Sequence, residues 1–392
     1  MAGNNRKSAL NLIMREGPMT ASLSAPLTVK GLTIKNRLAR SATWEALASP
    51  EGLATAKLQN LLAAVAAGGT GLIVTGMASV SRSGCGGPGE LLANGSECLP
   101  GLTELSAAMK KYGGIAAVQL AHSGAQVDPK TAGVEKPAGP SALDMPGKPP
   151  VSCRELSLPE IQTIVDDFAA AAALCARAGF DAVQLHCAHG YLLSQFLSPF
   201  YNRRADRYGG SILNRGRLIL EILEAIRGKA PDSLVLSAKI NSQDYVDGGL
   251  AIEDSRAIAG EMAAQGLDMI EVSGGLPQAG KLGPIRPKPE TPADEAPFAP
   301  AAAWFKEKLK IPVYVVAAVR SRGVAEHLVS SGQADGVALS RPLIREPDLA
   351  AKWLDGRQEG ADCVSCNACF KIALREPNGL YCPLVNPAGS PY

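Results

Sequence analysis

Two histidines and a tyrosine follow one apolar stretch of the chain within six residues. Residues 182–185 have the character of a buried strand, and His186, His189 and Tyr191 come directly after it. Two imidazoles and a phenol at the end of a strand can hold an anionic oxygen and donate a proton beside it. The whole chain has only four histidines, so this group predicts a catalytic site that uses all three side chains.

Two other roles for these histidines stay open on the sequence alone. A single histidine at a strand end is often a hydrogen-bonded structural residue. A zinc site would need three or four ligands, supported by a second layer of hydrogen bonds. The nearest further ligand is Cys187, which should point to the opposite face because side chains alternate along a strand. The spacing therefore disfavours a metal at this point.

The length and composition of the chain exclude several classes of protein. With 392 residues, 46% of them apolar, it can form one large α/β barrel or two ordinary domains without disulfide support. A net charge of +2 and the lack of a polybasic run argue against nucleic acids and membrane surfaces as partners. Nine cysteines, four of them between residues 363 and 382, indicate a reducing compartment, for which the cytoplasm is the default. The sequence does not decide whether the protein forms a homo-oligomer.

Eight short apolar runs alternate with amphipathic helical patterns between residues 36 and 356. No repeat or linker interrupts them, so we predict a single (β/α)8 TIM barrel, an α/β fold, over residues 24–360. Residues 1–23 are expected to be a flexible extension and residues 361–392 a cysteine-rich tail. The clearest helix is Leu158–Ala178, which Ser157 and Glu160 should begin as a capping box. The predicted strands are Leu38–Ala42, Gly71–Thr75, Ile115–Leu120, Ala182–Leu185, Leu234–Ile240, Met269–Val272, Val313–Val316 and Gly336–Ser340.

The segment that begins at His186 resembles the catalytic strand of the Old Yellow Enzyme family, the FMN-dependent ene reductases. This resemblance covers roughly residues 24–387 and implies a barrel with FMN at its carboxyl-terminal mouth, working by a ping-pong scheme. NAD(P)H would deliver hydride to flavin N5 and leave, and an α,β-unsaturated carbonyl compound would then take that hydride at Cβ. His186 and His189 would hold the carbonyl oxygen, and Tyr191 would protonate Cα. The matching residues are His186, Ala188, His189, Gly190, Tyr191, Leu192, Phe196, Leu197, Ser198, Pro199, Asn202, Arg203, Tyr208, Gly209 and Gly210.

The resemblance and the strand ends together assign a set of FMN-binding residues. Lys239 places a cation in an apolar strand, where it would stabilise the negative charge of reduced flavin; a structural salt bridge is the alternative. Gln119 has an amide that can donate to and accept from a pyrimidine edge. Barrels commonly bind phosphate in the last two loops, where Ala318 and Ser340 stand in place of the family's glycines. The full set is Ala42, Thr43, Met77, Gln119, Lys239, Ala318, Arg320, Ser340 and Arg341.

The tail resembles the cluster-binding segment of the 2,4-dienoyl-CoA reductase branch of that family. Its four cysteines are Cys363, Cys366, Cys369 and Cys382. Two residues separate the second cysteine from the third, where that branch usually has three. Four thiolates suit a [4Fe–4S] cluster or a tetrahedral zinc ion, and thiols without a metal are the third alternative.

The sequence therefore predicts an FMN-dependent NAD(P)H oxidoreductase of the ene reductase type, which acts on CH–CH groups of a small activated alkene or enone. Two other functions fit the same residues. A flavin and iron–sulfur dehydrogenase or demethylase would pass electrons from its substrate to a partner protein. A phosphate-binding barrel without redox chemistry, such as an isomerase or an aldolase, would hold no flavin.

Overall fold

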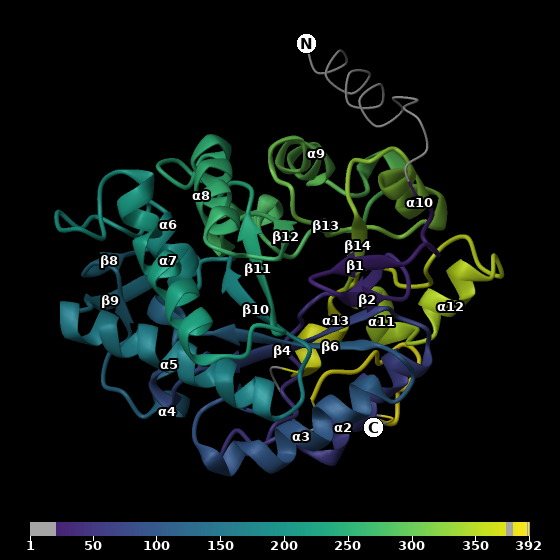
Figure 1. Cartoon of the computed structure of the whole chain (residues 1–392), viewed down its shortest axis with the longest axis horizontal. Helices are drawn as coiled ribbons and strands as arrows, with labels where there is room; N and C mark the ends of the chain where they lie inside the picture. The colour runs from purple at the N-terminus through teal and green to yellow at the C-terminus, as the bar shows by residue number, and fades with distance from the viewer. Residues whose placement is uncertain (1–20, 374–378, 390, 392) are drawn as a thin grey trace.

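Eight parallel strands form a closed barrel in the computed structural model of the protein, which describes residues 21–373, 379–389 and 391 (Figure 1). Each barrel strand pairs with the next one along the chain, and the last pairs with the first, which closes the ring. The eight predicted strands and the TIM barrel are thus confirmed. The strands are β3 (Leu38–Arg40), β4 (Leu72–Ser79), β6 (Ile115–Ala121), β10 (Ala182–Cys187), β11 (Val235–Asn241), β12 (Met269–Ser273), β13 (Val313–Val316) and β14 (Gly336–Leu339).

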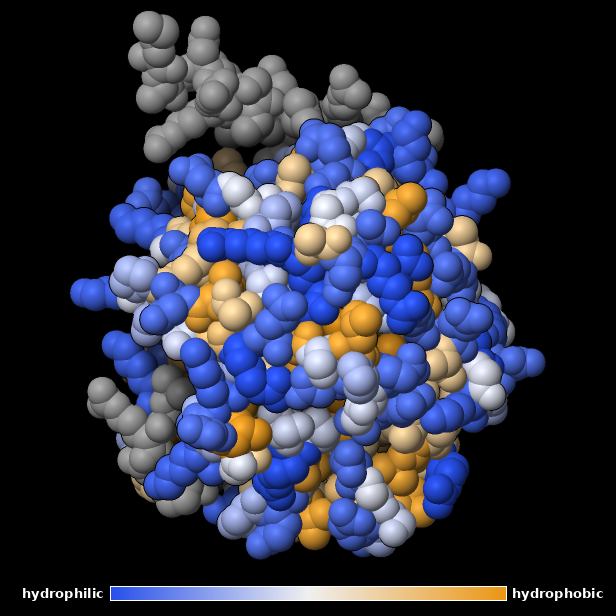
Figure 2. Space-filling view, turned by 90° about the vertical axis from the view of Figure 1, so that its left-hand side faces the viewer, coloured by the Kyte–Doolittle hydropathy of each residue, from blue (hydrophilic) through white to orange (hydrophobic). Residues whose placement is uncertain are grey.

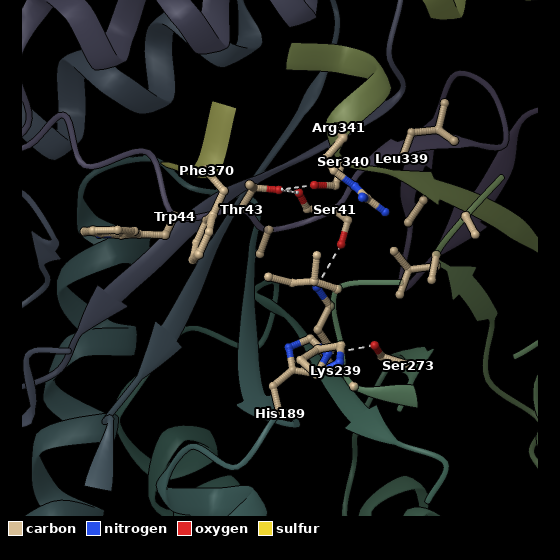
Figure 3. Close-up of a pocket in the computed structure, with 18 of the residues that line it drawn as sticks. Ser41, Thr43, Trp44, His189, Lys239, Ser273, Leu339, Ser340, Arg341 and Phe370 are labelled. Carbon is tan, nitrogen blue, oxygen red and sulfur yellow. Dashed lines mark hydrogen bonds between the residues drawn. The ribbon is translucent and has the colours of Figure 1, made fainter. Parts of the chain in front are cut away.

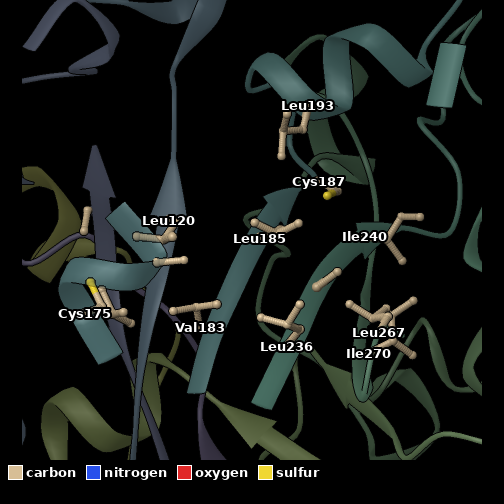
Figure 4. Close-up of a cluster of buried hydrophobic side chains, with 14 of the residues drawn as sticks. Leu120, Cys175, Val183, Leu185, Cys187, Leu193, Leu236, Ile240, Leu267 and Ile270 are labelled. Carbon is tan, nitrogen blue, oxygen red and sulfur yellow. The ribbon is translucent and has the colours of Figure 1, made fainter. Parts of the chain in front are cut away.

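Helices surround the barrel because its parallel strands are apolar on their outer face as well. Figure 4 shows part of this outer layer, where Val183 and Leu236 share one buried cluster with Cys175. Cys187 belongs to the same outer cluster, so it does point away from the cavity side of its strand, as predicted. The covering helices are α2 (Ala56–Ala67), α3 (Leu99–Lys110), α5 (Leu158–Arg177), α7 (Ile212–Lys229), α8 (Ile252–Ala264), α9 (Ala299–Lys308), α10 (Arg322–Ser330) and α12 (Leu349–Leu354).

Helix α5 begins where the sequence predicts it. The Ser157 hydroxyl accepts a hydrogen bond from the backbone N–H of Glu160 at 3.4 Å, and the Glu160 carboxylate accepts one from the N–H of Ser157 at 2.8 Å. This reciprocal capping box satisfies two N–H groups that have no partner inside the helix. The apolar face of α5, which includes Ile161, Ile164 and Phe168, is buried as the periodicity predicts.

The two ends of the barrel are closed by different structures. At the amino-terminal end, the hairpin of β1 (Leu27–Val29) and β2 (Leu32–Ile34) packs into one cluster with Leu72 and Tyr314 inside the barrel. The long connections lie at the other end, after β6 and β12. The first contains α4 (Pro129–Ala132) and a small sheet of β7 (Ala138–Gly139), β8 (Leu143–Met145) and β9 (Val151–Glu155), and the second contains the 3₁₀ segment η4 (Pro277–Leu282).

The chain after the barrel returns to this second end. Helix α13 (Ala368–Ala373) lies beside α11 (Arg341–Arg345) in Figure 1. Leu380 packs against Trp44, and its backbone N–H donates to the carbonyl oxygen of Glu45 at 2.8 Å. The C-terminal segment is therefore part of the structure around the barrel mouth.

The predicted extension at residues 1–23 lies almost wholly outside the described residues, so the domain limits at residues 23 and 360 stay predictions. Within the described part of the chain, the helices are too short or too polar to cross a membrane. The face drawn in Figure 2 is mostly hydrophilic, with its apolar residues in small separate groups.

Candidate active site

One cavity of about 540 Å³ lies at the carboxyl ends of the barrel strands (Figure 3). Ser273 at the end of β12 joins the predicted residues in its wall, so every barrel strand or its following loop contributes to the site. The placement agrees with the sequence prediction, whereas the chemical role of each residue stays a prediction. The predicted residues that line the cavity are Ala42, Thr43, Met77, Gln119, His186, His189, Tyr191, Lys239, Ala318, Arg320, Ser340 and Arg341.

The end of β10 brings the two histidines and the tyrosine together. The ring centroids of His186 and His189 are 5.2 Å apart at an interplanar angle of 89°, and those of His186 and Tyr191 are 4.8 Å apart. His189 and Gly190 have φ values of 64° and 75°, in the left-handed region. The chain therefore turns away from the direction of β10 at these residues. A Cβ atom at Gly190 would come within 2.9 Å of the Gln126 amide, so the turn needs glycine there.

Burial keeps this group uncharged. It lowers the pKa of His186 well below its usual value, with smaller contributions from His189 and Lys239, and burial and Lys239 lower the pKa of His189 in the same way. The pKa of Tyr191 is raised, first by burial and then by the charge of Glu90. At neutral pH the site therefore presents two neutral imidazoles and a protonated phenol.

The two histidines differ in their hydrogen bonds, which affects how each can meet a ligand. The His189 Nε2 atom lies 2.7 Å from the Ser273 hydroxyl, a contact drawn in Figure 3. The Nδ1 atom of His186 is buried and has no hydrogen-bond partner among the described residues. An unpaired polar atom in such a place costs free energy unless a ligand supplies the missing hydrogen bond. Ser273 was missed by sequence analysis because serine in a strand carries no distinctive signal.

Lys239 lines the cavity and also forms a buried ion pair. It therefore has the cavity position predicted for a flavin-binding cation and also the salt bridge that was the alternative. Its ammonium lies 3.2 Å from the Glu271 carboxylate, and the two side chains are only 3% and 4% exposed. Ser41 bridges them, since its hydroxyl accepts from Lys239 at 2.8 Å and donates to Glu271 at 2.6 Å. Glu271 was also missed, although a carboxylate in the apolar run of β12 is itself a signal.

The turn after β3 is held by a second buried ion pair. Arg40 donates to the Glu45 carboxylate at 3.0 Å, and the same carboxylate oxygen accepts from the Gly76 N–H at 2.7 Å. A Cβ atom at Gly76 would lie 2.0 Å from the other oxygen of that carboxylate, so only glycine allows this approach. The turn places the Thr43 hydroxyl 2.7 Å from the hydroxyl of Ser340, the residue that directly follows β14.

The loops after β13 and β14 have the properties of an anion site. Ala317 and Ala318 have φ values of 98° and 57°, a region in which glycine is favoured and each alanine costs about 1–3 kcal/mol. Two arginines follow, and neither has a carboxylate within ion-pair distance in the described part of the chain. Burial lowers the pKa of Arg320 to about 10, so it stays a cation at neutral pH. Strained backbone beside two arginines that have no carboxylate partner among the described side chains fits a phosphate group.

The four cysteines do not form the predicted metal site. Cys366 is exposed and Cys363 partly exposed, while Cys369 and Cys382 are buried. No three His, Cys, Asp or Glu side chains in the described residues come together as metal ligands. The iron–sulfur and zinc interpretations are therefore not supported by the structure.

The C-terminal segment contributes to the cavity instead. Phe370 and Cys369 line it, and the Phe370 ring meets the Trp44 ring edge to face at 6.5 Å (Figure 3). Arg320 donates to the Ser365 hydroxyl at 2.8 Å, and Arg341 donates to the Asn367 side chain at 2.7 Å. Long-range contacts of this kind leave no pattern in the sequence, so the role of the segment as a cavity wall was missed.

The chain is similar in sequence and in fold to several known proteins. The sequence profile of the NADH:flavin oxidoreductase / NADH oxidase family matches residues 22–359. A 4,4'-dithiodibutanoate disulfide reductase from Rhodococcus erythropolis is 31% identical over 379 residues, which cover 90% of this chain and 93% of that protein. The structure of an Old Yellow Enzyme homologue from Zymomonas mobilis aligns with a TM-score of 0.75 at 25% identity, over 87% of this chain and 95% of that one.

A larger protein is also similar. The structure of a 2-naphthoyl-CoA reductase in complex with 2-naphthoyl-CoA aligns with a TM-score of 0.82 at 27% identity. The alignment covers 89% of this chain but 54% of that one, so this chain spans about half its length. The profile match extends over most of the barrel, and a relative of similar length is 31% identical. The chain therefore belongs to the NADH:flavin oxidoreductase / NADH oxidase family, the Old Yellow Enzyme family of NAD(P)H-dependent flavin oxidoreductases.

Proposed function

We propose that the protein reduces the activated C=C bond of a small α,β-unsaturated carbonyl compound, with NAD(P)H as electron source and FMN as bound cofactor. The observation that carries this proposal is the group at the end of β10. The uncharged imidazole rings of His186 and His189 have their centroids 5.2 Å apart. The centroid of the protonated Tyr191 ring lies 4.8 Å from that of His186. FMN, when bound, accepts hydride from NAD(P)H and passes it to the alkene.

The residues around the cavity fit FMN. Lys239 would stand beside the part of the ring that becomes negative on reduction, and Gln119 offers an amide to its pyrimidine edge. The strained backbone at Ala318 and the cations of Arg320 and Arg341 suit the phosphate. Ala42, Thr43, Met77 and Ser340 complete the proposed FMN-binding set, all in the cavity wall.

The side chains of β10 would then act on the substrate itself. His186 and His189 hold the carbonyl oxygen by hydrogen bonds and so stabilise the negative charge that develops there. Tyr191 gives its hydroxyl proton to the α carbon. Because burial raises its pKa, the phenol is in the acid form over the whole neutral range.

The test follows the two half-reactions separately under anaerobic conditions. NAD(P)H is expected to bleach the flavin absorbance, and addition of 2-cyclohexenone is expected to restore it with formation of the saturated ketone. A protein purified without flavin would contradict the proposal at its first step. Rapid bleaching by a saturated substrate, with slow bleaching by NAD(P)H, would support the dehydrogenase alternative.

Reduction of a disulfide is a second candidate. Two observations favour it: the similar Rhodococcus erythropolis protein is named for that activity, and the Cys369 thiol lines the cavity. NAD(P)H and one proton would convert one disulfide into two thiols. To decide between the two substrates, the reduced protein is mixed with 4,4'-dithiodibutanoate in place of the enone. Reduction of the disulfide would be seen as reoxidation of the flavin and as new thiols in a thiol titration.

A further inference from the structure

We propose that Glu271 sets the reduction potential of the flavin by compensating the charge of Lys239, an inference that rests on the proposed FMN site. Glu271 lies on β12 and does not itself line the cavity. Its carboxylate is 3.2 Å from the Lys239 ammonium, which does line it. The charge that a ligand meets at this wall is therefore that of an ion pair.

Hydrogen bonds from neighbouring strands hold this pair in place. Ser41 donates to one carboxylate oxygen of Glu271 at 2.6 Å, and Gln184 donates to the other at 3.0 Å. Ser41 also accepts from Lys239 at 2.8 Å, so the ammonium has two acceptors and a fixed position. Figure 3 shows Ser41 pointing at Lys239 from the β3 side of the cavity.

The same network reaches the residue proposed for the pyrimidine edge. Gln184 accepts from the Gln119 amide nitrogen at 2.7 Å, and both glutamines are buried. A continuous chain of hydrogen bonds thus joins Gln119 to Glu271 through Gln184. Because one N–H of the Gln119 side chain is used in this chain, the side chain keeps its carbonyl oxygen and its second N–H for a ligand in the cavity.

The sign of the effect follows from electrostatics between buried charges. Reduction adds negative charge to the flavin, which a cation stabilises and an anion opposes. Glu271 offsets part of the field of Lys239, so the wild-type potential is lower than Lys239 alone would give. A purely structural role predicts the opposite: if Glu271 only held Lys239 in place, its loss would move the cation away and lower the potential.

The experiment measures the flavin midpoint potential by redox titration with reference dyes. Glu271→Gln is expected to shift the equilibrium at least tenfold toward reduced flavin, which corresponds to an increase of about 30 mV for two electrons. Glu346→Gln is the matched control, because Glu346 is another buried, hydrogen-bonded carboxylate that does not line the cavity. This control is expected to keep the wild-type potential. An unchanged or lower potential in Glu271→Gln would overturn the proposal.

A second pair of variants covers the case in which Glu271→Gln does not fold, since removing one partner of a buried ion pair is strongly destabilising. Lys239→Gln is expected to lower the potential, and adding Glu271→Gln to it is expected to raise the potential again. A double variant at or below the value of Lys239→Gln would equally overturn the proposal. Wild-type protein that binds no FMN would refute the proposed function, whereas a normal flavin with no shift would refute only the role of Glu271.

Discussion

Replacing Tyr191 by Phe removes one hydroxyl group from the cavity and little else. In the described structure that hydroxyl makes no hydrogen bond to the protein, and the ring packs 4.8 Å from His186. Phenylalanine keeps the ring and its contact, so we expect the free energy of unfolding to change by less than about 0.5 kcal/mol. The variant therefore separates proton donation from folding and from flavin binding.

The expected kinetic loss is confined to one half-reaction. A general acid contributes about 10²–10⁴-fold, and each tenfold corresponds to about 1.4 kcal/mol, so the barrier for enone reduction should rise by about 3–5 kcal/mol. Reduction of the flavin by NAD(P)H needs no proton on carbon and should keep its wild-type rate. Burial raises the pKa of Tyr191. The wild-type enone step should consequently show no loss from phenol ionisation up to about pH 10.

Stopped-flow absorbance at the flavin band measures both steps in one preparation. Quinones take up electrons without protonation at carbon, so they serve as the matched acceptor that should still reoxidise the variant quickly. Equal slowing of both half-reactions, or equal slowing with enone and quinone, would show that Tyr191 positions the ligands and is not the proton donor.

Three further predictions concern the histidines. The double variant His186→Ala and His189→Ala should retain FMN but lose the charge-transfer band that a phenol produces with wild-type protein. A band of normal intensity would exclude a role of the two histidines in binding the ligand's oxygen atom. Ser273→Ala should weaken phenol binding by about 1 kcal/mol, roughly fivefold, in a spectral titration, because it removes the hydrogen bond that orients His189; unchanged affinity would contradict this. Burial lowers the pKa of His122 to about 4. The unfolded chain takes up that proton below about pH 6.5 and the folded chain does not, so stability is lost as pH falls from 6.5 to 4. In His122→Asn, the free energy of unfolding from urea titrations should fall by about 3 kcal/mol less than in wild type between pH 6.5 and pH 4. The same pH dependence in both proteins would refute this prediction.

The predicted parts of the structure share a local signal. The barrel strands are short apolar runs that alternate with helical patterns, and the start of α5 is encoded by Ser157 and Glu160, which lie close together in the sequence. His186, His189 and Tyr191 lie within one short segment, so their proximity follows from the chain itself. Parallel barrel strands all present their carboxyl ends on one side, which is why residues at seven separate strand ends were expected in one cavity.

Other parts of the site depend on contacts between distant strands. Glu271 pairs with Lys239 because neighbouring strands β11 and β12 place the two residues in the same register. Ser273 at the end of β12 meets His189, which follows β10 two strands away, at a sequence distance of 84 residues. A polar residue in a strand is visible in the sequence, but its partner is set by barrel closure and stagger, which no local pattern records.

The cysteine-rich tail shows the difference most clearly. By itself, the sequence determined the fold, the cavity end of the barrel and the grouping of His186, His189 and Tyr191, since these follow from periodicity and from residues close together in the chain. The spacing of four cysteines predicted a metal site, yet their burial differs and no ligand set forms in the described residues. Tertiary structure alone decided that this segment packs through Phe370 and Leu380 against Trp44 and walls the cavity. The physical reason is that a ligand set needs side-chain directions to converge, and those directions are determined by packing between segments more than 300 residues apart.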